Sequence, residues 1–257
     1  MLLKIGICAS PQEAKCVCGM ADYIEMNLSY LASLSEEEVK EIKADMDACG
    51  ITVSATNNLF PGDMRLCGKD VDTDAIFAYI RKAIESAALM GVAFCVFGSG
   101  RQRNIPDTED RMACEKQLAD MIRFMGDCAK PHGITIVLEP LNSAETNVIN
   151  TAREGAAWVK KIGHPNVMLL VDIFHMVKEK ESESVIIENI DIIRHMHIAE
   201  PEKRLYPRSG DAYDYSALKK LLTEAGYDGS ISIEGIPTGD FSESATESLA
   251  FLKSVFA

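Results

Sequence analysis

Four acidic or imidazole side chains stand at the ends of apolar segments in the second half of the chain. Each segment is short and rich in apolar residues, which is typical of a strand buried on both faces. An ionisable side chain at such a place is costly unless something pairs with it. The four residues are Glu139, Asp172, His197 and Glu234. We expect them to meet around one divalent metal ion.

Three carboxylates and one imidazole make a hard donor set of oxygen and nitrogen atoms. Such a set suits Mn²⁺ best, accepts Mg²⁺ or Co²⁺, and is less suited to ions that prefer thiolates. Taken alone, each acid is more often an ordinary solvated loop residue. Four of them in register on consecutive strand-like segments favour the metal interpretation.

The histidines of this region differ in their expected roles. His195 and His197 are two residues apart, so they share one face of a strand. His197 is nearer the carboxyl end and is the better ligand, whereas His195 is expected inside the fold. His175 follows Asp172 by three residues, in a loop where it can touch a substrate hydroxyl. The alternative for His175 is a loop histidine bonded to a backbone carbonyl.

The elements that position these residues alternate along the chain. Apolar runs predict strands, and segments with helical periodicity separate them. The strands are expected at residues 4–9, 23–27, 51–56, 92–97, 134–138, 167–173, 194–198 and 229–234. The helices are expected at residues 35–49, 73–90, 108–130, 151–162, 183–189, 215–225 and 242–256, with at most a reduced helix within 10–19.

This alternation predicts an α/β fold with a parallel sheet. Eight units in 257 residues favour a single (β/α)₈ TIM barrel that occupies residues 1–257 as one domain. The chemistry of such barrels lies at the carboxyl ends of the strands. Adjacent strands are about 5 Å apart, so side chains at one level of strands five to eight can converge.

The composition indicates which partners and which cellular location to expect for the protein. Thirty-nine acids against 26 lysines and arginines give a net charge of −13, which argues against a nucleic acid. No apolar run approaches the roughly 18 residues of a membrane span. The first residues lead directly into a strand, without the basic region of a signal peptide. With eight cysteines in no framework spacing, these features predict a cytoplasmic protein with free thiols. The oligomeric state stays open, with a homo-oligomer possible.

The order of these motifs resembles that of the xylose isomerase-like TIM barrels, the sugar phosphate isomerase/epimerase superfamily. The nearest pattern is that of the ketose 3-epimerases that act on D-tagatose and D-psicose. The motifs that carry the resemblance are Glu139-Pro-Leu-Asn-Ser-Ala-Glu145, Asp172-Ile-Phe-His175-Met, His195-Met-His197-Ile-Ala-Glu200 with two basic residues after it, and Glu234 on the last strand.

The resemblance implies a sugar as the small-molecule substrate and a role for each matching residue. Glu139, Asp172, His197 and Glu234 are then the metal ligands, and Glu139 and Glu234 are also the acid/base pair.

Further residues are then expected to contact the sugar. Glu145, His175 and one basic residue take this part by resemblance. The family has its basic residue six positions after the ligand histidine, where this chain has Lys203, with Arg204 next to it. Either one is a candidate. Glu25, at the end of the second strand and across the barrel, is expected to bind sugar hydroxyls, with a plain loop acid as the alternative.

Two loops carry arginines next to glycines. Gly98-Ser-Gly-Arg-Gln-Arg103 is a candidate anion site, because backbone amides and arginines bind phosphate or carboxylate groups. The alternative is a simple turn. The segment Arg208-Ser-Gly-Asp211 is a candidate for closing over the sugar.

Elementary chemistry supports an isomerase or epimerase. A metal that chelates the carbonyl and hydroxyl of a ketose acidifies the intervening C–H by stabilising the enediolate. Two carboxylates on opposite sides of that carbon can remove and return a proton. The alternative is a dehydratase (lyase) of a keto-cyclitol or of the dehydroshikimate type. An endonuclease-like barrel is disfavoured by the acidic charge, and a non-catalytic sugar-binding barrel by the presence of both Glu139 and Glu234.

Overall fold

Eight parallel strands close into a barrel in a computed structural model that describes residues 3–257. Each strand pairs with its neighbours in chain order, and β1 pairs with β8 to close the ring. The strands are Lys4–Cys8 (β1), Tyr23–Asn27 (β2), Val53–Asn57 (β3), Phe94–Phe97 (β4), Thr135–Leu138 (β5), Val167–Asp172 (β6), Ile193–Ile198 (β7) and Ser230–Ile233 (β8). The TIM barrel and all eight expected strands are confirmed.

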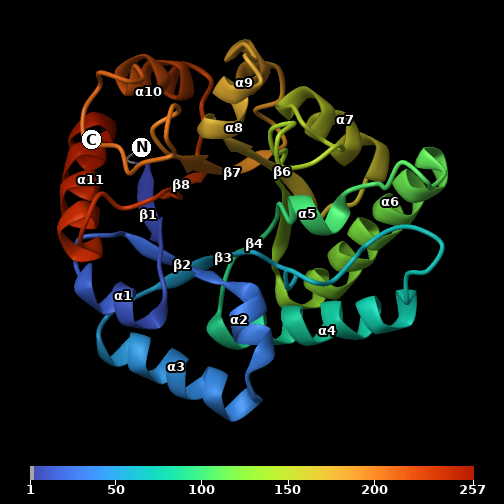
Figure 1. The fold of residues 1–257 in the computed structure, drawn as a ribbon. Coiled ribbons are helices and arrows are strands. Elements are labelled where there is room, and N and C mark those ends of the chain that lie inside the picture. Colours follow the sequence, from blue (N-terminus) through green and yellow to red (C-terminus); the bar gives the residue numbers. More distant parts are fainter. Residues whose placement is uncertain (1–2) are drawn as a thin grey trace.

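Helices surround the strands on all sides of the ring (Figure 1). The helices that helical periodicity predicted are confirmed as Glu36–Ala48 (α3), Thr73–Met90 (α4), Arg111–Ala129 (α6), Ala152–Ile162 (α7), Ser184–Glu188 (α9), Tyr215–Glu224 (α10) and Phe241–Phe256 (α11). The first connection holds only the short helix Pro11–Cys16 (α1), as expected. Among residues 3–257, no helix is both long and apolar enough to span a bilayer.

Four short elements were not predicted. Three come soon after a strand: Leu28–Ser33 (α2), Gly100–Arg103 (α5) and Ile173–Lys178 (α8). The fourth is the 3₁₀ turn Lys130–His132 (η1), which follows α6. Side-chain caps start two of them: the Asn27 side chain accepts from Tyr30 N, and the Asp172 side chain accepts from Phe174 N at 2.8 Å. Each cap satisfies an amide that a first helical turn leaves without a partner.

The barrel interior has its own apolar layer, separate from the main core between the strands and the helices. Val96, Val137 and Leu170 form this layer, with Phe94 and Met168 packed against it. Their neighbours along the strands belong instead to the main core, as the alternation of a strand requires. The interior is therefore filled from below by apolar side chains, and its carboxyl end is left for polar ones.

Candidate metal centre and active site

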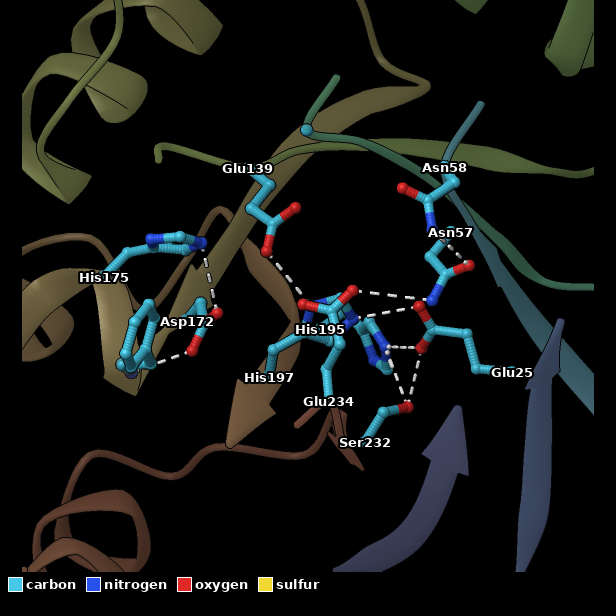
Figure 2. A network of polar contacts seen from close by, with 12 residues as sticks. Glu25, Asn57, Asn58, Glu139, Asp172, His175, His195, His197, Ser232 and Glu234 are labelled. Carbon is cyan, nitrogen blue, oxygen red and sulfur yellow. Dashed lines mark hydrogen bonds and ion pairs between the residues drawn. The ribbon is translucent and has the colours of Figure 1, made fainter. Parts of the chain in front are cut away.

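The structure brings the four expected ligands together at the carboxyl end of the barrel. Their donor atoms all lie within 4.8 Å of one another. Figure 2 shows Glu139 above and Asp172 to the left of His197 and Glu234, whose side chains overlap in this view. The residues involved are Glu139, Asp172, His197 and Glu234, the set predicted from the strand ends.

Strand periodicity explains this convergence. Side chains two residues apart share a face of a strand, so Glu139 follows Val137 into the interior and Asp172 follows Leu170. On β7, His197 is paired with Asp172 of β6, and with Ser232 of β8 two residues before Glu234. The four side chains thus form the layer directly above the apolar filling of the barrel.

One nitrogen of the His197 imidazole faces the carboxylates of Glu139 and Glu234. Its Nδ1 lies 3.1 Å from Glu139 Oε1 and 3.3 Å from Glu234 Oε2. The His197 side chain is fully buried, and Glu139 is 4% exposed. Nδ1 is therefore the atom that His197 offers to a shared ion.

Two buried polar atoms beside this cluster have no hydrogen-bond partner. They are Oδ2 of Asp172 and Nε2 of His175, which lie 3.5 Å apart. Buried polar atoms are nearly always paired, so such an orphan indicates a group that completes the site. A divalent cation at Asp172 Oδ2, within reach of two further carboxylates and one imidazole nitrogen, matches this donor set.

The electrostatics of the cluster also favour a cation. Burial, with the nearby Glu139 carboxylate, raises the pKa of Asp172 to about 7. Burial and the charge of Glu234 raise the pKa of Glu139 in the same way. Burial acts on Glu234 too, but His197 and Arg204 outweigh it and lower the pKa of Glu234 to about 2. Three closely spaced acids, two of them buried, repel one another here, and a bound cation relieves that repulsion.

Arg204, and not Lys203, is the basic residue at this cluster. The Arg204 guanidinium donates to Glu234 Oε2 at 2.6 Å and to Glu145 Oε1 at 3.5 Å. It also lies 3.9 Å from Asp172 Oδ2. Lys203 is exposed and only its backbone amide is bonded nearby, to the side chain of Glu200. Of the two neighbours, Arg204 is therefore the one whose side chain lies at the cluster.

The backbone of Arg204 is held in an unusual conformation. Its φ of 57° lies in the left-handed region, which is strained for a residue with a side chain. The Ile236 amide donates to the Arg204 carbonyl at 2.7 Å, next to Gly235. A Cβ at Gly235 would lie 2.7 Å from that carbonyl oxygen, so only glycine permits the approach. These backbone contacts stabilise the strained conformation, and in this conformation the Arg204 side chain reaches Glu234.

His175 lies in a short helix, which corrects its expected place in a loop. It belongs to α8 and is 2% exposed. Its Nδ1 accepts from the Asn142 amide at 3.2 Å and lies 2.8 Å from Asn142 Nδ2. Asn142 Nδ2 also donates to Glu145 at 3.0 Å. Asn142, which the motif contains but to which we assigned no task, therefore holds two of the expected sugar contacts in place, and His175 Nε2 is left free to donate.

Glu25 lies beneath the cluster, and its surroundings differ from those of a sugar ligand. It is 0% exposed, and its two carboxylate oxygens contact His197, His195 and Ser232. Burial raises the pKa of Glu25, but the charge of His197 and the histidine hydrogen bonds lower it far below its usual value. Both oxygens of Glu25 are therefore bonded within the protein, while the residue also lines the adjoining cavity, and its contact with sugar hydroxyls stays a prediction.

The loop after β4 is not an anion site, and this corrects the expectation for residues 98–103. Arg103 is fully buried and donates to the carbonyls of Gly98, Glu139 and Ile149 at 2.6, 2.9 and 3.1 Å. Burial lowers the pKa of Arg103 to about 10, so it stays charged at neutral pH. Its two terminal guanidinium nitrogens donate within the protein, where they join the ends of β4 and β5.

The segment at 208–211, which was expected to close over the sugar, contacts helix α11. Arg208 donates to Ser244 Oγ at 2.7 Å and lies 3.2 Å from Glu247 on α11. These contacts hold the loop after β7 against that helix, and they do not support a closing movement over the sugar.

A cavity of about 580 Å³ adjoins the cluster on the side of β1, β2 and β3. Glu25 and Asn57 line it, and Asn57 Nδ2 lies 3.5 Å from Glu234 Oε1. The other lining residues follow the same three strands and are mainly polar: Cys8, Ala9, Ser10, Pro11, Gln12, Glu13, Met26, Asn27, Tyr30 and Asn58. The cavity is large enough for a sugar beside the metal centre.

Comparisons with known proteins agree with this architecture. The model of the xylose isomerase-like TIM barrel family matches residues 18–255. A ketose 3-epimerase of Arthrobacter globiformis is 25% identical over 240 residues, 93% of this chain and 72% of that protein. A D-psicose 3-epimerase of Ruminiclostridium cellulolyticum is 28% identical over 222 residues, 83% of this chain and 73% of that protein. A solved D-psicose 3-epimerase structure, obtained in the presence of D-fructose, superimposes with a TM-score of 0.85 at 23% identity, covering 99% of both chains.

Proposed function

This chain belongs to the family of xylose isomerase-like TIM barrels, and from that premise we propose that it is a metal-dependent epimerase of ketoses. The observation that carries the proposal is the convergence of four donors around the orphaned Oδ2 of Asp172. Relatives described as ketose 3-epimerases support the reaction class. The metal is one divalent ion, with Mn²⁺ favoured over Mg²⁺ or Co²⁺.

The ligands are Glu139, Asp172, His197 through Nδ1, and Glu234. When bound, the cation supplies Lewis-acid polarisation of the ketose carbonyl and its neighbouring hydroxyl, which acidifies the adjacent C–H. Glu139 and Glu234 enter from β5 and β8. One carboxylate removes the proton from one face of that carbon, and the other delivers a proton to the opposite face. The carbon skeleton stays intact and only the configuration changes.

Three further side chains hold the sugar. His175 offers its free Nε2–H to a hydroxyl, and the partly exposed Glu145 accepts from another. Arg204 lies between Glu145 and Glu234, so its guanidinium positions both the substrate and one acid/base carboxylate. Preorganised contacts of this kind keep the reacting carbon between the two glutamates.

The proposed substrate is an uncharged sugar. The cavity beside the centre is lined by two acids, Glu13 and Glu25, and by no lysine or arginine. Cationic donors bind a phosphate or carboxylate group most strongly, and this lining offers only neutral amides and hydroxyls as donors. Arg204, the nearest cation, is already paired with carboxylates. We therefore infer that free ketoses are preferred over ketose phosphates.

Proton exchange in deuterated water tests this function. The protein, stripped of metal and reloaded with Mn²⁺, is incubated with a panel of free ketoses and with the matching ketose phosphates. We expect deuterium at a single carbon next to the carbonyl of a free ketose, together with its epimer. Loss of water from the substrate would identify the lyase alternative. Absence of exchange with every ketose would contradict the proposal, and faster exchange with the phosphates would overturn the preference for uncharged sugars.

A further inference from the structure

A buried hydrogen-bond network lies next to the candidate metal centre, and Glu25, at the right in Figure 2, bonds to each of its other members. Oε1 of Glu25 lies 2.9 Å from His197 Nε2. Oε2 lies 2.8 Å from His195 Nε2 and accepts from Ser232 Oγ at 2.7 Å. All four side chains are 0% exposed. The sequence separates Glu25 from the histidines by 170 and 172 residues, and the closed barrel brings them together.

The chemistry of a carboxylate fixes the direction of these hydrogen bonds. An ionised carboxylate only accepts, so the Nε2 atom of each histidine carries the proton. When a cation takes the place of the Nδ1 proton, the Nε2 proton stays hydrogen-bonded to Glu25, and Nδ1, which lies 3.1 Å from Glu139 and 3.3 Å from Glu234, is the nitrogen that can bind the cation. An imidazole binds a metal through its unprotonated nitrogen, and the bond made by the other nitrogen decides which one that is.

We propose that Glu25 is a positioning residue that holds His197 in the Nε2-protonated form and so presents Nδ1 to the metal. This inference rests on the proposed metal centre and adds to it a residue that touches neither the metal nor the reacting carbon. It gives Glu25 a different task from the sugar contact expected from the sequence.

The network also holds Glu25 itself in place. Tyr23 Oη lies 2.9 Å from Ser232 Oγ. The second nitrogen of the His195 imidazole, Nδ1, lies 2.8 Å from Ser230 Oγ. The His195 ring stacks on Phe94 with centroids 5.5 Å apart and an interplanar angle of 14°. A carboxylate that accepts three hydrogen bonds within a packed layer cannot turn toward a ligand without leaving buried donors unpaired. The fixed carboxylate of Glu25 can therefore hold the His197 imidazole in one orientation.

The tautomer of His197 can be measured in the unaltered protein. The chain has only five histidines, so long-range ¹H–¹⁵N spectra of ¹⁵N-histidine-labelled protein are simple to assign, with His197→Gln identifying the signals of His197. In protein loaded with diamagnetic Mg²⁺, we expect His197 to be protonated at Nε2 and not at Nδ1. A proton on Nδ1 would overturn the inference, and this result does not depend on whether any Glu25 variant folds.

The second test is the Mn²⁺ affinity of Glu25→Gln, measured from free Mn²⁺ by electron paramagnetic resonance. The glutamine side chain has a single acceptor oxygen for the two imidazole donors. We therefore expect the dissociation constant for Mn²⁺ to rise by about 10–100-fold. Glu13→Gln is the matched control, because Glu13 lines the same cavity, carries the same charge and is bonded only to Ser10. It should bind Mn²⁺ as the unaltered protein does.

The two proposals fail in distinguishable ways. If the unaltered protein binds no Mn²⁺ at the four-residue cluster, the proposed metal centre is wrong and the inference falls with it. If the unaltered protein binds Mn²⁺ and a folded Glu25→Gln variant binds it within about twofold, only the role of Glu25 is wrong. Recovery of affinity in Glu25→Asp, which keeps the charge on a shorter side chain, would argue for charge alone and against positioning.

Discussion

Arg204 is the cation that links the acids of the centre. Its guanidinium bonds to Glu234 and Glu145 and approaches Asp172, which lie on or after three different strands. It also lies over the Phe174 ring, 4.9 Å from the centroid. A planar, permanently charged group with several donors suits such a position better than the single point charge of lysine.

Arg204→Met should therefore lower kcat/KM by about 10–150-fold, because a hydrogen bond to a charged group contributes about 1.5–3 kcal/mol. Lys203→Met is the neighbouring control and should leave kcat/KM unchanged, since that side chain is exposed. Steady-state kinetics on a free ketose give the comparison. Equal losses in both variants would show that the choice of Arg204 is wrong.

Cysteine reactivity is a second property decided at single residues. Burial raises the pKa of Cys95 to about 12, and burial together with Cys114 does the same for Cys67. At pH 8 only about one in ten thousand of these thiols is ionised. Cys16, Cys18 and Cys49 are exposed. We expect a thiol reagent to modify these three rapidly in folded protein, and all eight after unfolding; rapid labelling of Cys67 or Cys95 would contradict the buried positions.

The sequence predicted which side chains converge where a strand end marks them. Each of the four candidate ligands follows an apolar run, and that pattern alone gives its place at the carboxyl face. It did not separate Arg204 from Lys203, because the difference depends on a left-handed backbone at Arg204 next to Gly235. It also missed the contacts of Glu25, because its partners belong to β7 and β8, which are far from β2 in the sequence.

At the scale of elements, the edge between β4 and β5 shapes the centre. A Cβ at Gly98 would lie 2.3 Å from Glu139 Oε2, so the glycine leaves the space that this carboxylate occupies. Arg103, five residues later, ties the Gly98 and Glu139 carbonyls together. Gly98 and Arg103, two of the residues that suggested an anion site, are therefore the residues that position this candidate ligand.

Gly98→Ala should displace the Glu139 carboxylate and weaken Mn²⁺ binding on the order of 10–100-fold, the range for loss of a supporting contact. Gly62→Ala is the control, because a Cβ there meets nothing within 4 Å. Calorimetric titration with Mn²⁺ measures both variants, and circular dichroism monitors the fold. Unchanged affinity in Gly98→Ala would mean that Glu139 does not need this space.

Arg103→Met should lower the free energy of unfolding by about 3–5 kcal/mol, because it leaves three buried carbonyls without their donor. Urea unfolding followed by circular dichroism measures the change. The exposed Arg101→Met, in the same loop, serves as the control and should change stability by less than about 0.5 kcal/mol. A loss below about 1 kcal/mol for Arg103→Met would contradict its role in joining the two strands.

The elements themselves were predictable to different degrees. Long helices such as Thr73–Met90 carry many turns of periodicity, and buried strands carry apolar runs, so both were found. Helices of six residues, such as α2 and α8, have too few turns for a pattern. They depend on side-chain caps at Asn27 and Asp172, and Asp172 caps α8 through Oδ1 while Oδ2 stays free for the centre.

At the scale of the whole molecule, closure of the barrel makes the site. An open sheet would separate Glu25 on β2 from the histidines on β7, but the pairing of β8 with β1 brings them together across the ring. The eightfold alternation of strand and helix was sufficient to predict this closure. The shape of the cavity along β1, β2 and β3 was not predictable, because it depends on how far the loops after those strands stand from the centre.

The most direct test of the metal centre is a crystal grown with Mn²⁺ and measured for anomalous scattering. We predict one anomalous peak per chain, roughly 2.0–2.3 Å from an oxygen of each of the three acids and from His197 Nδ1. The three acids are Glu139, Asp172 and Glu234. A structure at the same Mn²⁺ concentration in which these four side chains surround no anomalous peak, while the ion binds elsewhere or not at all, would contradict the account.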